Sequence, residues 1–325
     1  MSDLVLVTGG AGYVGASLVE QLRAKDRPVR VFDVFLHDQD GVGARLEGLG
    51  AELQRGDIRD EAARRAALEG VGAVVHLAAI VGDPACARDP QLSQAVNVDS
   101  TRALADEARA AGVSHLVFAS TCSNYGRMAD PTVAVDETAE LAPVSLYAEQ
   151  KVEVETLLLS GATAPMAATC LRLATVYGVA ARMRFDLTVN EFTRDLWADR
   201  DLEVFGEQFW RPYVHVRDAA RAMTMVLDAG PEAMGGEVFN VGDSDENYRK
   251  LDLVEIITGQ LGRGQVSYVH RDEDPRDYRV AFGKVHEQLG FEPSMRVPDG
   301  VREVAGALDD GAFGDPWAGA YRNIP

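Results

Sequence analysis

Short apolar runs alternate with longer amphipathic stretches over the first half of this chain. The runs that predict buried strands lie at 4–7, 28–33, 51–58, 73–79, 115–121 and 168–174. Apolar residues at helical spacing follow several of these runs, at 16–22, 91–111 and 143–160. Strands and helices that alternate in this way imply right-handed crossovers and a parallel sheet covered on both faces. The pattern predicts the α/β fold class with a doubly wound parallel sheet.

After residue 174 this rhythm changes. Helices are predicted around 187–197 and 251–261, and short strands near 202–205, 266–269 and 279–282. Two further apolar segments, 213–216 and 237–242, are predicted to return to the main sheet. Because no clean linker is visible, we expect a smaller, interleaved C-terminal lobe. Its substrate-binding role is implied only by the family resemblance given below. The larger domain would comprise 1–174 plus about 212–243, and the lobe about 175–211 plus 244–325.

The first strand runs into a glycine-rich turn, Gly9-Gly-Ala-Gly12-Tyr-Val-Gly15, and a helix follows directly. Strand, glycine turn and helix in this order form the setting of the Rossmann dinucleotide-binding fingerprint. Glycines let the backbone approach a pyrophosphate, whose charge meets the amide-rich, positive end of the helix. The alternative is an ordinary structural turn. The strand–helix setting favours the dinucleotide site and a Rossmann-type domain.

A carboxylate, Asp33, ends the second predicted strand about 20 residues beyond the glycine turn. At this spacing an acidic residue accepts hydrogen bonds from the adenosine ribose of a dinucleotide. It also repels a 2′-phosphate, so NAD is favoured over NADP. The alternative is an ordinary polar strand end.

Composition narrows the partners of this 325-residue chain. A formal net charge of −19 without a basic stripe argues against nucleic acid. No apolar run is long enough to span a bilayer and no leader-like segment precedes the first strand, so we expect a cytoplasmic protein with no membrane partner. The three cysteines lack metal-ligand spacing, and no metal is expected. Lysine occurs only four times, so arginine and helix ends must hold any phosphate-bearing ligand.

Candidate chemistry lies at a strand end and on the helix that follows it. Ser120 and Thr121 end the fifth strand, at the edge where doubly wound sheets bind ligands. Tyr147 and Lys151 are four residues apart and share one helix face, where an ammonium lowers the pKa of a phenol. Such a phenol exchanges protons with a substrate hydroxyl, which hydride transfer requires. A surface i,i+4 pair is the alternative. His76, inside the fourth strand, is interpreted as a packed core histidine.

Together these motifs resemble the extended short-chain dehydrogenase/reductase superfamily, in particular its NAD-dependent nucleotide-sugar epimerases and dehydratases. The resemblance covers nearly the whole chain. Further matching segments are Gly56-Asp57-Ile58, His76-Leu-Ala-Ala79, Asn97, Tyr125-Gly126, Leu171-Arg172, Val176-Tyr177-Gly178 and Arg211-Pro-Tyr-Val-His-Val-Arg-Asp218. The set is specific for the superfamily and much less so for the reaction.

The resemblance implies a role for each matched residue. Thr121 is implied to bond the reacting sugar hydroxyl, Tyr147 to be the acid/base, and Lys151 to bind the nicotinamide ribose as well. Contacts with NAD are implied for Gly9, Gly12, Tyr13, Val14, Gly15, Asp33, Asp57, Ile58, Leu77, Ala78, Ala79, Asn97 and Ser120. Substrate contacts are implied for Cys122, Ser123, Asn190, Arg211, Arg276 and Arg279. For the arginines, a solvated surface charge is the alternative.

Departures from the family pattern bear on the reaction. Sugar-nucleotide 4,6-dehydratases carry Asp and Glu directly after the catalytic Thr, where this chain has Cys122 and Ser123. A 4,6-dehydratase is therefore disfavoured. Cys122 either enters the sugar pocket as an acid or packs at the strand end. Thr175 replaces the asparagine that usually precedes Val-Tyr-Gly, and the segment 182–187 departs from the common epimerase pattern, which bears on substrate specificity.

Three hypotheses follow. The first is an NAD-dependent epimerase of carbohydrate metabolism that acts at C4 of a nucleoside-diphosphate sugar. The second is an NAD(P)-dependent reductase or dehydrogenase of a nucleotide-linked sugar or its keto form, against which Asp33 counts because reductive members often prefer NADPH. The third is a non-catalytic cofactor-sensing protein, disfavoured by the intact Tyr147 and Lys151. The resemblance also implies a homodimer through helices around 95–111 and 147–160, whose apolar faces are alternatively core faces.

Overall fold

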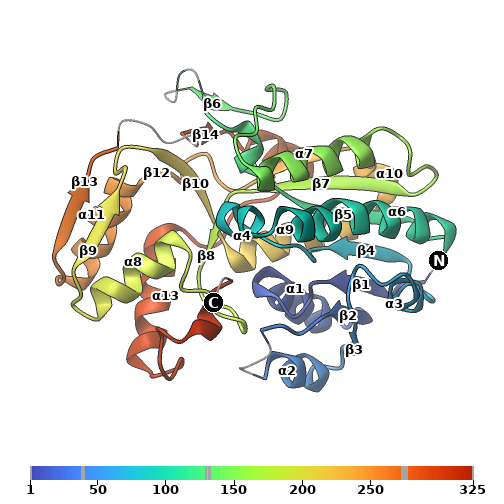
Figure 1. Ribbon diagram of the computed structural model, residues 1–325, viewed down its shortest axis with the longest axis horizontal. Helices are drawn as coiled ribbons and strands as arrows, with labels where there is room; N and C mark the ends of the chain where they lie inside the picture. The colour runs from blue at the N-terminus through green and yellow to red at the C-terminus, as the bar shows by residue number, and fades with distance from the viewer. Residues whose placement is uncertain (1, 38–40, 129, 131–132, 272–276, 324–325) are drawn as a thin grey trace.

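A seven-stranded parallel sheet dominates the structure, a computed structural model that describes residues 2–37, 41–128, 130, 133–271 and 277–323. Its strand order is β11-β7-β5-β4-β1-β2-β3 (Figure 1). The strands are β1 (Val5–Thr8), β2 (Val29–Asp33), β3 (Glu52–Arg55), β4 (Ala73–His76), β5 (His115–Thr121), β7 (Ala167–Leu173) and β11 (Val238–Val241). The order reverses between β1 and β4, where carboxyl strand ends leave a ligand crevice in doubly wound sheets. The predicted Rossmann-type sheet is confirmed.

Helices cover both faces of this sheet. One core lies under α1 (Tyr13–Ala24), α2 (Val42–Gly48) and α9 (Val216–Ala229), and the other under α3 (Glu61–Ala67), α6 (Ser100–Ala110) and α7 (Leu146–Leu159). Strand β1 serves both, since Val5 and Val7 belong to the first core and Leu6 to the second. The short helices are α4 (Asp83–Arg88), α5 (Pro90–Gln94), α10 (Pro231–Met234) and α12 (Gly283–Leu289).

The single helix predicted over 91–111 is divided. Helix α5 ends at Gln94, a π-helical turn spans Ala95–Asp99, and α6 continues from Ser100. Such turns occur often at functional sites. Here the turn contains Asn97, whose side chain is directed at the loop after β4.

Most of the apolar residues considered for a dimer face, which are Leu104, Ala108, Val154, Leu157 and Leu158, are core residues. All of them except Leu157 are at most 2 % exposed and belong to the second core, so for these four the intramolecular alternative is right. Leu157 is half-buried and lies outside that core. The homodimer itself stays a prediction.

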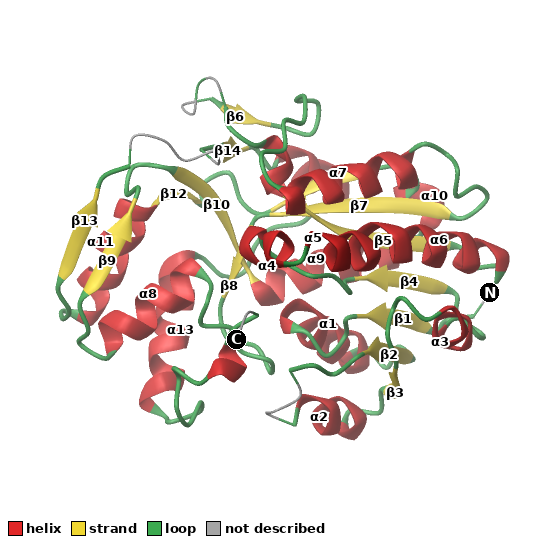
Figure 2. Ribbon diagram, viewed as in Figure 1, coloured by secondary structure: helices red, strands yellow, loops and turns green. Residues whose placement is uncertain are grey.

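The smaller lobe, at the left of Figure 2, is built on α8 (Thr188–Trp197), α11 (Lys250–Leu261) and α13 (Val297–Asp309). Its strands are β8 (Thr175–Tyr177), β10 (Trp210–His215) and β12 (Asn247–Arg249) in one sheet, and the pair β9 (Leu202–Phe205) and β13 (Val266–Val269). A further pair is β6 (Ala134–Val135) and β14 (Arg279–Val280), and 3₁₀ turns span Cys122–Tyr125 and Gly319–Tyr321. The expected return of 213–216 to the main sheet is wrong: β10 pairs with β8 and β12, because β11 already occupies the edge of β7.

The chain returns to the larger domain through α9 and β11. Helix α9 packs beside α1 and β11 pairs with β7, although lobe segments precede and follow them in sequence. The exact domain limits stay a prediction. Over the described ranges, no helix is long and apolar enough to cross a membrane, and no three His, Cys, Asp or Glu side chains are grouped to hold a metal.

Candidate active site

The glycine turn lies against the end of β4 and at the start of α1. Gly9 has a φ of +70°, and a Cβ there would lie 2.7 Å from the backbone nitrogen of Ala78. A Cβ on Gly15 would overlap the carbonyl oxygen of Gly9, so both positions require glycine. Helix α1 begins without a side-chain cap and without an acidic residue in its first turn. These features fit the diphosphate of a dinucleotide, which needs close backbone approach and a positive helix end.

Asp33, at the end of β2, faces this turn. Its Oδ2 accepts a hydrogen bond from the backbone nitrogen of Ala11 at 3.0 Å, and its Oδ1 from that of Phe35 at 2.7 Å. Burial raises the pKa of Asp33, and these N–H groups act in the opposite direction. The carboxylate is therefore held where a ribose would be bound. Asp57 is paired with Arg59 (Oδ2–Nη2 2.6 Å), whose hydrogen bonds lower the pKa of that carboxyl.

The residues after β4 lie beside the glycine turn. This sheet edge, from the glycine turn to the start of α7, is where the cofactor is predicted to bind and is called the groove. The backbone N–H groups of Leu77 and Ala78 each donate to Thr8 Oγ1 at 3.3 Å. Leu77, Ala78 and Ala79 are half-buried, as is Val14 on α1. The structure thus brings these predicted cofactor contacts to the same sheet edge as the glycine turn. Ile58 and Tyr13 are buried at that edge, with 5 % and 6 % exposure.

Asn97 connects the loop after β4 to α7. Its Oδ1 accepts from the backbone nitrogen of Ile80 at 2.8 Å, and its Nδ2 donates to the carbonyl of Ile80 at 3.0 Å and to Gln150 Oε1 at 2.8 Å. Both ends of the amide are engaged inside the protein. Asn97 therefore positions the loop after β4, and its role as a direct cofactor contact stays a prediction.

His76 is the packed core histidine that its place in the strand predicted. Thr101 donates to the carbonyl of Asn97 at 2.7 Å, so its oxygen accepts from His76 Nε2 at 2.8 Å. Nδ1 then accepts from the Thr8 hydroxyl at 2.7 Å. This tautomer follows from the hydrogen-bond network. Burial lowers the pKa of His76 to about 3, so the ring stays neutral and serves the core.

Helix α7 starts beside the groove because Ser145 caps it. The Ser145 hydroxyl accepts from the backbone nitrogen of Ala148 at 3.3 Å and donates to Asp83 Oδ1 at 2.6 Å. This second bond joins α4 to the first turn of α7, on which Tyr147 lies. The sequence did not predict this role of Asp83, because nothing in the pattern distinguishes it from the other acidic residues.

Tyr147 and Lys151 of α7 lie beside the end of β5, whose last residue is Thr121. Lys151 is buried and its Nζ donates to the carbonyl of Ala119 at 2.7 Å. The same Nζ lies 4.4 Å from the ring centroid of Phe118 and 5.8 Å from that of Tyr147. Tyr147 and Thr121 are half-buried, so a ligand in the groove can reach them. The predicted shared helix face of Tyr147 and Lys151 is present.

The pKa of Tyr147 shifts in the direction opposite to the one that the sequence predicted. Burial raises the pKa of Tyr147, and Cys86 and Asp83 add to the rise, whereas Arg184 acts to lower it. Burial also lowers the pKa of Lys151 to about 8, against Cys86 and Glu155. The expected lowering of the Tyr147 pKa is therefore not seen. The reason is that desolvation of the phenol outweighs the nearby positive charges.

A buried polar network beneath the strand end was missed from the sequence. Glu155, one turn beyond Lys151, pairs with Arg172 of β7 at 2.8 Å (Oε2–Nη2). Glu155 Oε1 also accepts from the Ser120 hydroxyl and, at 2.8 Å, from Asn124 Nδ2. Ser120 is thus part of the support of the site, because its hydroxyl is directed inward. The available signal was an arginine inside an apolar strand, which needs a buried partner.

The two positions after Thr121 have different surroundings. Cys122 is 1 % exposed, and its thiol donates to the carbonyl of Arg172 at 3.2 Å. Burial raises the pKa of this thiol well above its ordinary value. Cys122 packs at the strand end, which was one of its two predicted alternatives, and its contact with a substrate stays a prediction. Ser123 is half-buried, with its hydroxyl 3.2 Å from that of Tyr278.

Asn190 of α8 is engaged within the protein. Its Oδ1 accepts from the backbone nitrogen of Gly178 at 2.9 Å, and its Nδ2 donates to the carbonyl of Arg184 at 2.8 Å and to the Tyr13 hydroxyl at 3.2 Å. Tyr13 in turn donates to the carbonyl of Gly178 at 2.6 Å. The side chain is fully buried and joins the smaller lobe to α1. Its contact with a substrate diphosphate stays a prediction.

Two of the arginines predicted to bind substrate lie over aromatic rings. The Arg211 guanidinium lies 5.2 Å from the ring centroid of Tyr278, whose hydroxyl meets Ser123. The Arg279 guanidinium lies 4.7 Å from the ring centroid of Trp210. Both side chains are half-buried. Arg276 lies outside the described residues.

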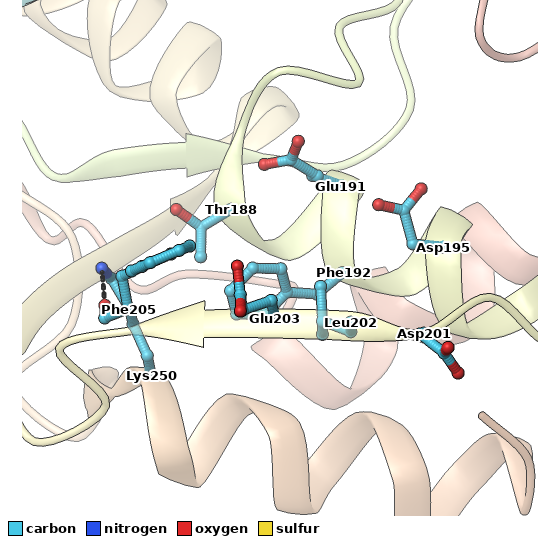
Figure 3. A pocket seen from close by; sticks show the side chains of 9 residues that line it. All are labelled: Thr188, Glu191, Phe192, Asp195, Asp201, Leu202, Glu203, Phe205 and Lys250. Atoms are coloured by element: carbon cyan, nitrogen blue, oxygen red, sulfur yellow. Dashed lines mark hydrogen bonds between the residues drawn. The ribbon is translucent and has the colours of Figure 1, made fainter. Parts of the chain in front are cut away.

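A cavity of about 400 Å³ lies in the smaller lobe between α8, β9 and the start of α11 (Figure 3). Its lining is acidic, and the single ammonium, from Lys250, donates to the carbonyl of Phe205 at 2.6 Å. The lining residues are Thr188, Glu191, Phe192, Asp195, Asp201, Leu202, Glu203, Phe205 and Lys250. Four carboxylates make this cavity unsuited to phosphate groups.

Fold and site together define a Rossmann-type enzyme that uses NAD, with a Thr–Tyr–Lys constellation at the sheet edge. The profile of the NAD dependent epimerase/dehydratase family matches residues 5–242, and the chain belongs to this family. Family relatives catalyse different reactions. The chain is 30 % identical over 316 residues to a dTDP-glucose 4,6-dehydratase of an Actinoplanes species, covering 92 % of this chain and 96 % of that one. It is 29 % identical over 320 residues to a UDP-glucose 4-epimerase of Streptomyces lividans, covering 90 % and 92 %.

Solved structures of an epimerase and of a dehydratase also match this chain over nearly its whole length. The UDP-glucose 4-epimerase of Thermus thermophilus, in complex with NAD, matches with a TM-score of 0.82 and 26 % identity over 94 % of this chain and 99 % of that one. The dTDP-glucose 4,6-dehydratase of Streptomyces venezuelae, with NAD bound, matches with a TM-score of 0.85 and 26 % identity over 96 % and 99 %. The predicted superfamily and cofactor are confirmed.

Proposed function

We propose that this protein is an NAD-dependent epimerase that inverts C4 of a nucleoside-diphosphate sugar. The observation that carries the proposal is the pair of positions after Thr121. A buried thiol, Cys122, and a hydroxyl, Ser123, stand where 4,6-dehydratases have two carboxylates. Without that acid/base pair the site has the groups for oxidation and reduction at one carbon and lacks those for elimination.

The roles of the residues follow from their places. NAD, when bound, supplies a hydride acceptor and donor. Tyr147 takes the proton of the C4 hydroxyl as that carbon is oxidised and returns it when the keto sugar is reduced on its other face. Thr121 holds the same hydroxyl. The Lys151 ammonium, 5.8 Å from the ring centroid of Tyr147, stabilises the phenolate that forms during turnover, against the burial that favours the neutral phenol.

The substrate diphosphate is assigned to the arginine side of the cleft. Arg211 is the foremost candidate, because Tyr278 and Ser123 connect it to the strand end. Arg279 is placed second, and Arg276 keeps its sequence-based role as a proposal. Since the lobe cavity between α8 and β9 is acidic, the phosphates are not assigned there.

The experiment is incubation of the protein with a panel of UDP- and dTDP-sugars. Epimerisation predicts interconversion of two sugar nucleotides without a net change in NADH absorbance. A net NADH signal would support the alternative, a nucleotide-sugar reductase or dehydrogenase, and loss of water from the sugar would support a dehydratase. Homodimerisation and a cytoplasmic location accompany the proposal as predictions, to be checked by light scattering and fractionation.

A further inference from the structure

The segment between β8 and α8 lies against the start of α1 (Figure 1). Asn190 Nδ2 donates both to the Tyr13 hydroxyl, at 3.2 Å, and to the backbone carbonyl of Arg184, at 2.8 Å. Tyr13 is the first residue of α1, directly after the glycine turn. The backbone of Arg184 is therefore held close to the helix end that fits a diphosphate.

The guanidinium of Arg184 pairs with Asp186, and its charge also acts on titratable groups around the glycine turn. Its positive charge opposes the rise in pKa that burial causes at Tyr13 and at Tyr147. At His37, burial lowers the pKa to about 4, and Arg182 and Arg184 add to that effect. These three residues lie at the glycine turn, at the catalytic helix and four residues beyond Asp33. This shared influence agrees with the place of the Arg184 backbone, which Asn190 holds close to the start of α1.

We propose that Arg184 is the residue through which the smaller lobe binds the diphosphate of NAD. Asp186 prepares it for this contact, accepting from Nε at 2.8 Å and from Nη2 at 3.0 Å. Asp186 is held in turn by the backbone nitrogen of Asn323 at 2.9 Å. This arrangement fixes the guanidinium plane and leaves the Nη1 hydrogens for a phosphate oxygen. The side chain of Arg184 is 13 % exposed, so the contact forms with little further desolvation.

This contact makes both lobes part of the cofactor site. The glycine turn supplies backbone N–H groups from one side, and Arg184 supplies a cation from the other. The inference depends on NAD as the cofactor and not on which sugar carbon is epimerised. Failure of the epimerase assay therefore leaves it intact, and failure of the binding test leaves the epimerase proposal intact.

The test is calorimetric titration of the cofactor-free protein with NAD and with ADP-ribose, which keeps the diphosphate and lacks nicotinamide. We expect Arg184→Ala to weaken both ligands about tenfold, the effect of one charge-assisted contact. Adenosine, followed by saturation-transfer NMR, should bind unchanged. Arg302→Ala, at an exposed arginine of the same lobe paired with Asp299, is the matched control and should change nothing.

A second variant separates electrostatics from packing. Asp186→Asn removes the negative charge beside Arg184 and should leave NAD affinity equal or a few-fold tighter, with a steeper dependence on salt. Unchanged NAD affinity in Arg184→Ala would overturn the proposal. Three other results for Arg184→Ala would also overturn it. These are weaker binding of NAD with unchanged binding of ADP-ribose, equally weakened binding of adenosine, and weaker binding of UDP-glucose alone.

Discussion

Glu155 of α7 and Arg172 of β7 form an ion pair of 2.8 Å in which the two side chains are only 3 % and 5 % exposed. The Ser120 hydroxyl donates to the same carboxylate, and Asn124 Nδ2 donates to it at 2.8 Å. The pair therefore holds both the end of β5, where Thr121 lies, and the turn after it. The charge of Glu155 also opposes the fall in the pKa of Lys151 that burial causes.

Breaking this pair should destabilise the protein. Glu155→Gln leaves Arg172 as an unpaired buried charge, which costs about 3–5 kcal/mol in comparable sites. Urea unfolding followed by circular dichroism measures the loss. The control is Glu153→Gln on the same helix, whose partner Arg102 is about half exposed and whose loss should cost under about 1 kcal/mol. Equal costs for the two variants would contradict the buried-network interpretation.

Removal of the phenol should abolish turnover. Tyr147→Phe deletes the group that exchanges the substrate proton, and we expect kcat to fall by at least about a hundredfold. The ring and its contacts remain, so NAD content and thermal stability should stay as in the unchanged protein. Turnover is measured by chromatographic separation of the sugar nucleotides. Near-normal turnover in this variant would mean that another group carries the proton.

The pKa of Lys151 predicts opposite pH dependences for activity and stability. Burial lowers this pKa from 10.5 to about 8, so the ammonium that supports Tyr147 is lost as the pH rises through about 8. Activity that depends on it should decline there. In the unfolded chain the lysine stays protonated up to its ordinary pKa, so the desolvation cost of folding disappears between pH 8 and 10.5.

The check is the pH dependence of unfolding free energy for the unchanged protein and for Lys151→Met. The difference between them should shift in favour of the unchanged protein by up to about 3 kcal/mol from about pH 8 to about pH 10.5. Below about pH 8 the difference should be constant. A difference that is flat over the whole range would show that Lys151 titrates near its ordinary pKa.

Asp33 should decide between the two dinucleotides. Asp33→Asn removes the charge that repels a 2′-phosphate. Its single amide oxygen can replace only one of the two carboxylate oxygens that accept from the N–H groups of Ala11 and Phe35. We expect NAD to bind about tenfold more weakly and the ratio of NADP to NAD affinity to rise. Fluorescence titration with both dinucleotides measures this ratio. Glu52→Gln, an exposed change on the neighbouring strand, serves as the control and should leave the ratio unaltered.

The sequence by itself determined the fold class, the glycine turn, Asp33 and the Tyr147–Lys151 face. Each of these depends on spacing within one or two adjacent elements: four residues on a helix, a strand followed by glycines, or a strand end. Local backbone geometry sets these relations, and the spacing of residues along the sequence therefore predicts them.

Only the tertiary structure decided how the remaining side chains are used. Asn190 meets Tyr13, 177 positions away, and this contact joins the two lobes. The Cys122 thiol donates to the carbonyl of Arg172 on the neighbouring strand, and the Arg184 guanidinium pairs with Asp186. The physical reason is that the direction of a side chain and the partners of its polar atoms depend on which distant segments pack beside it, and no spacing along the chain encodes that.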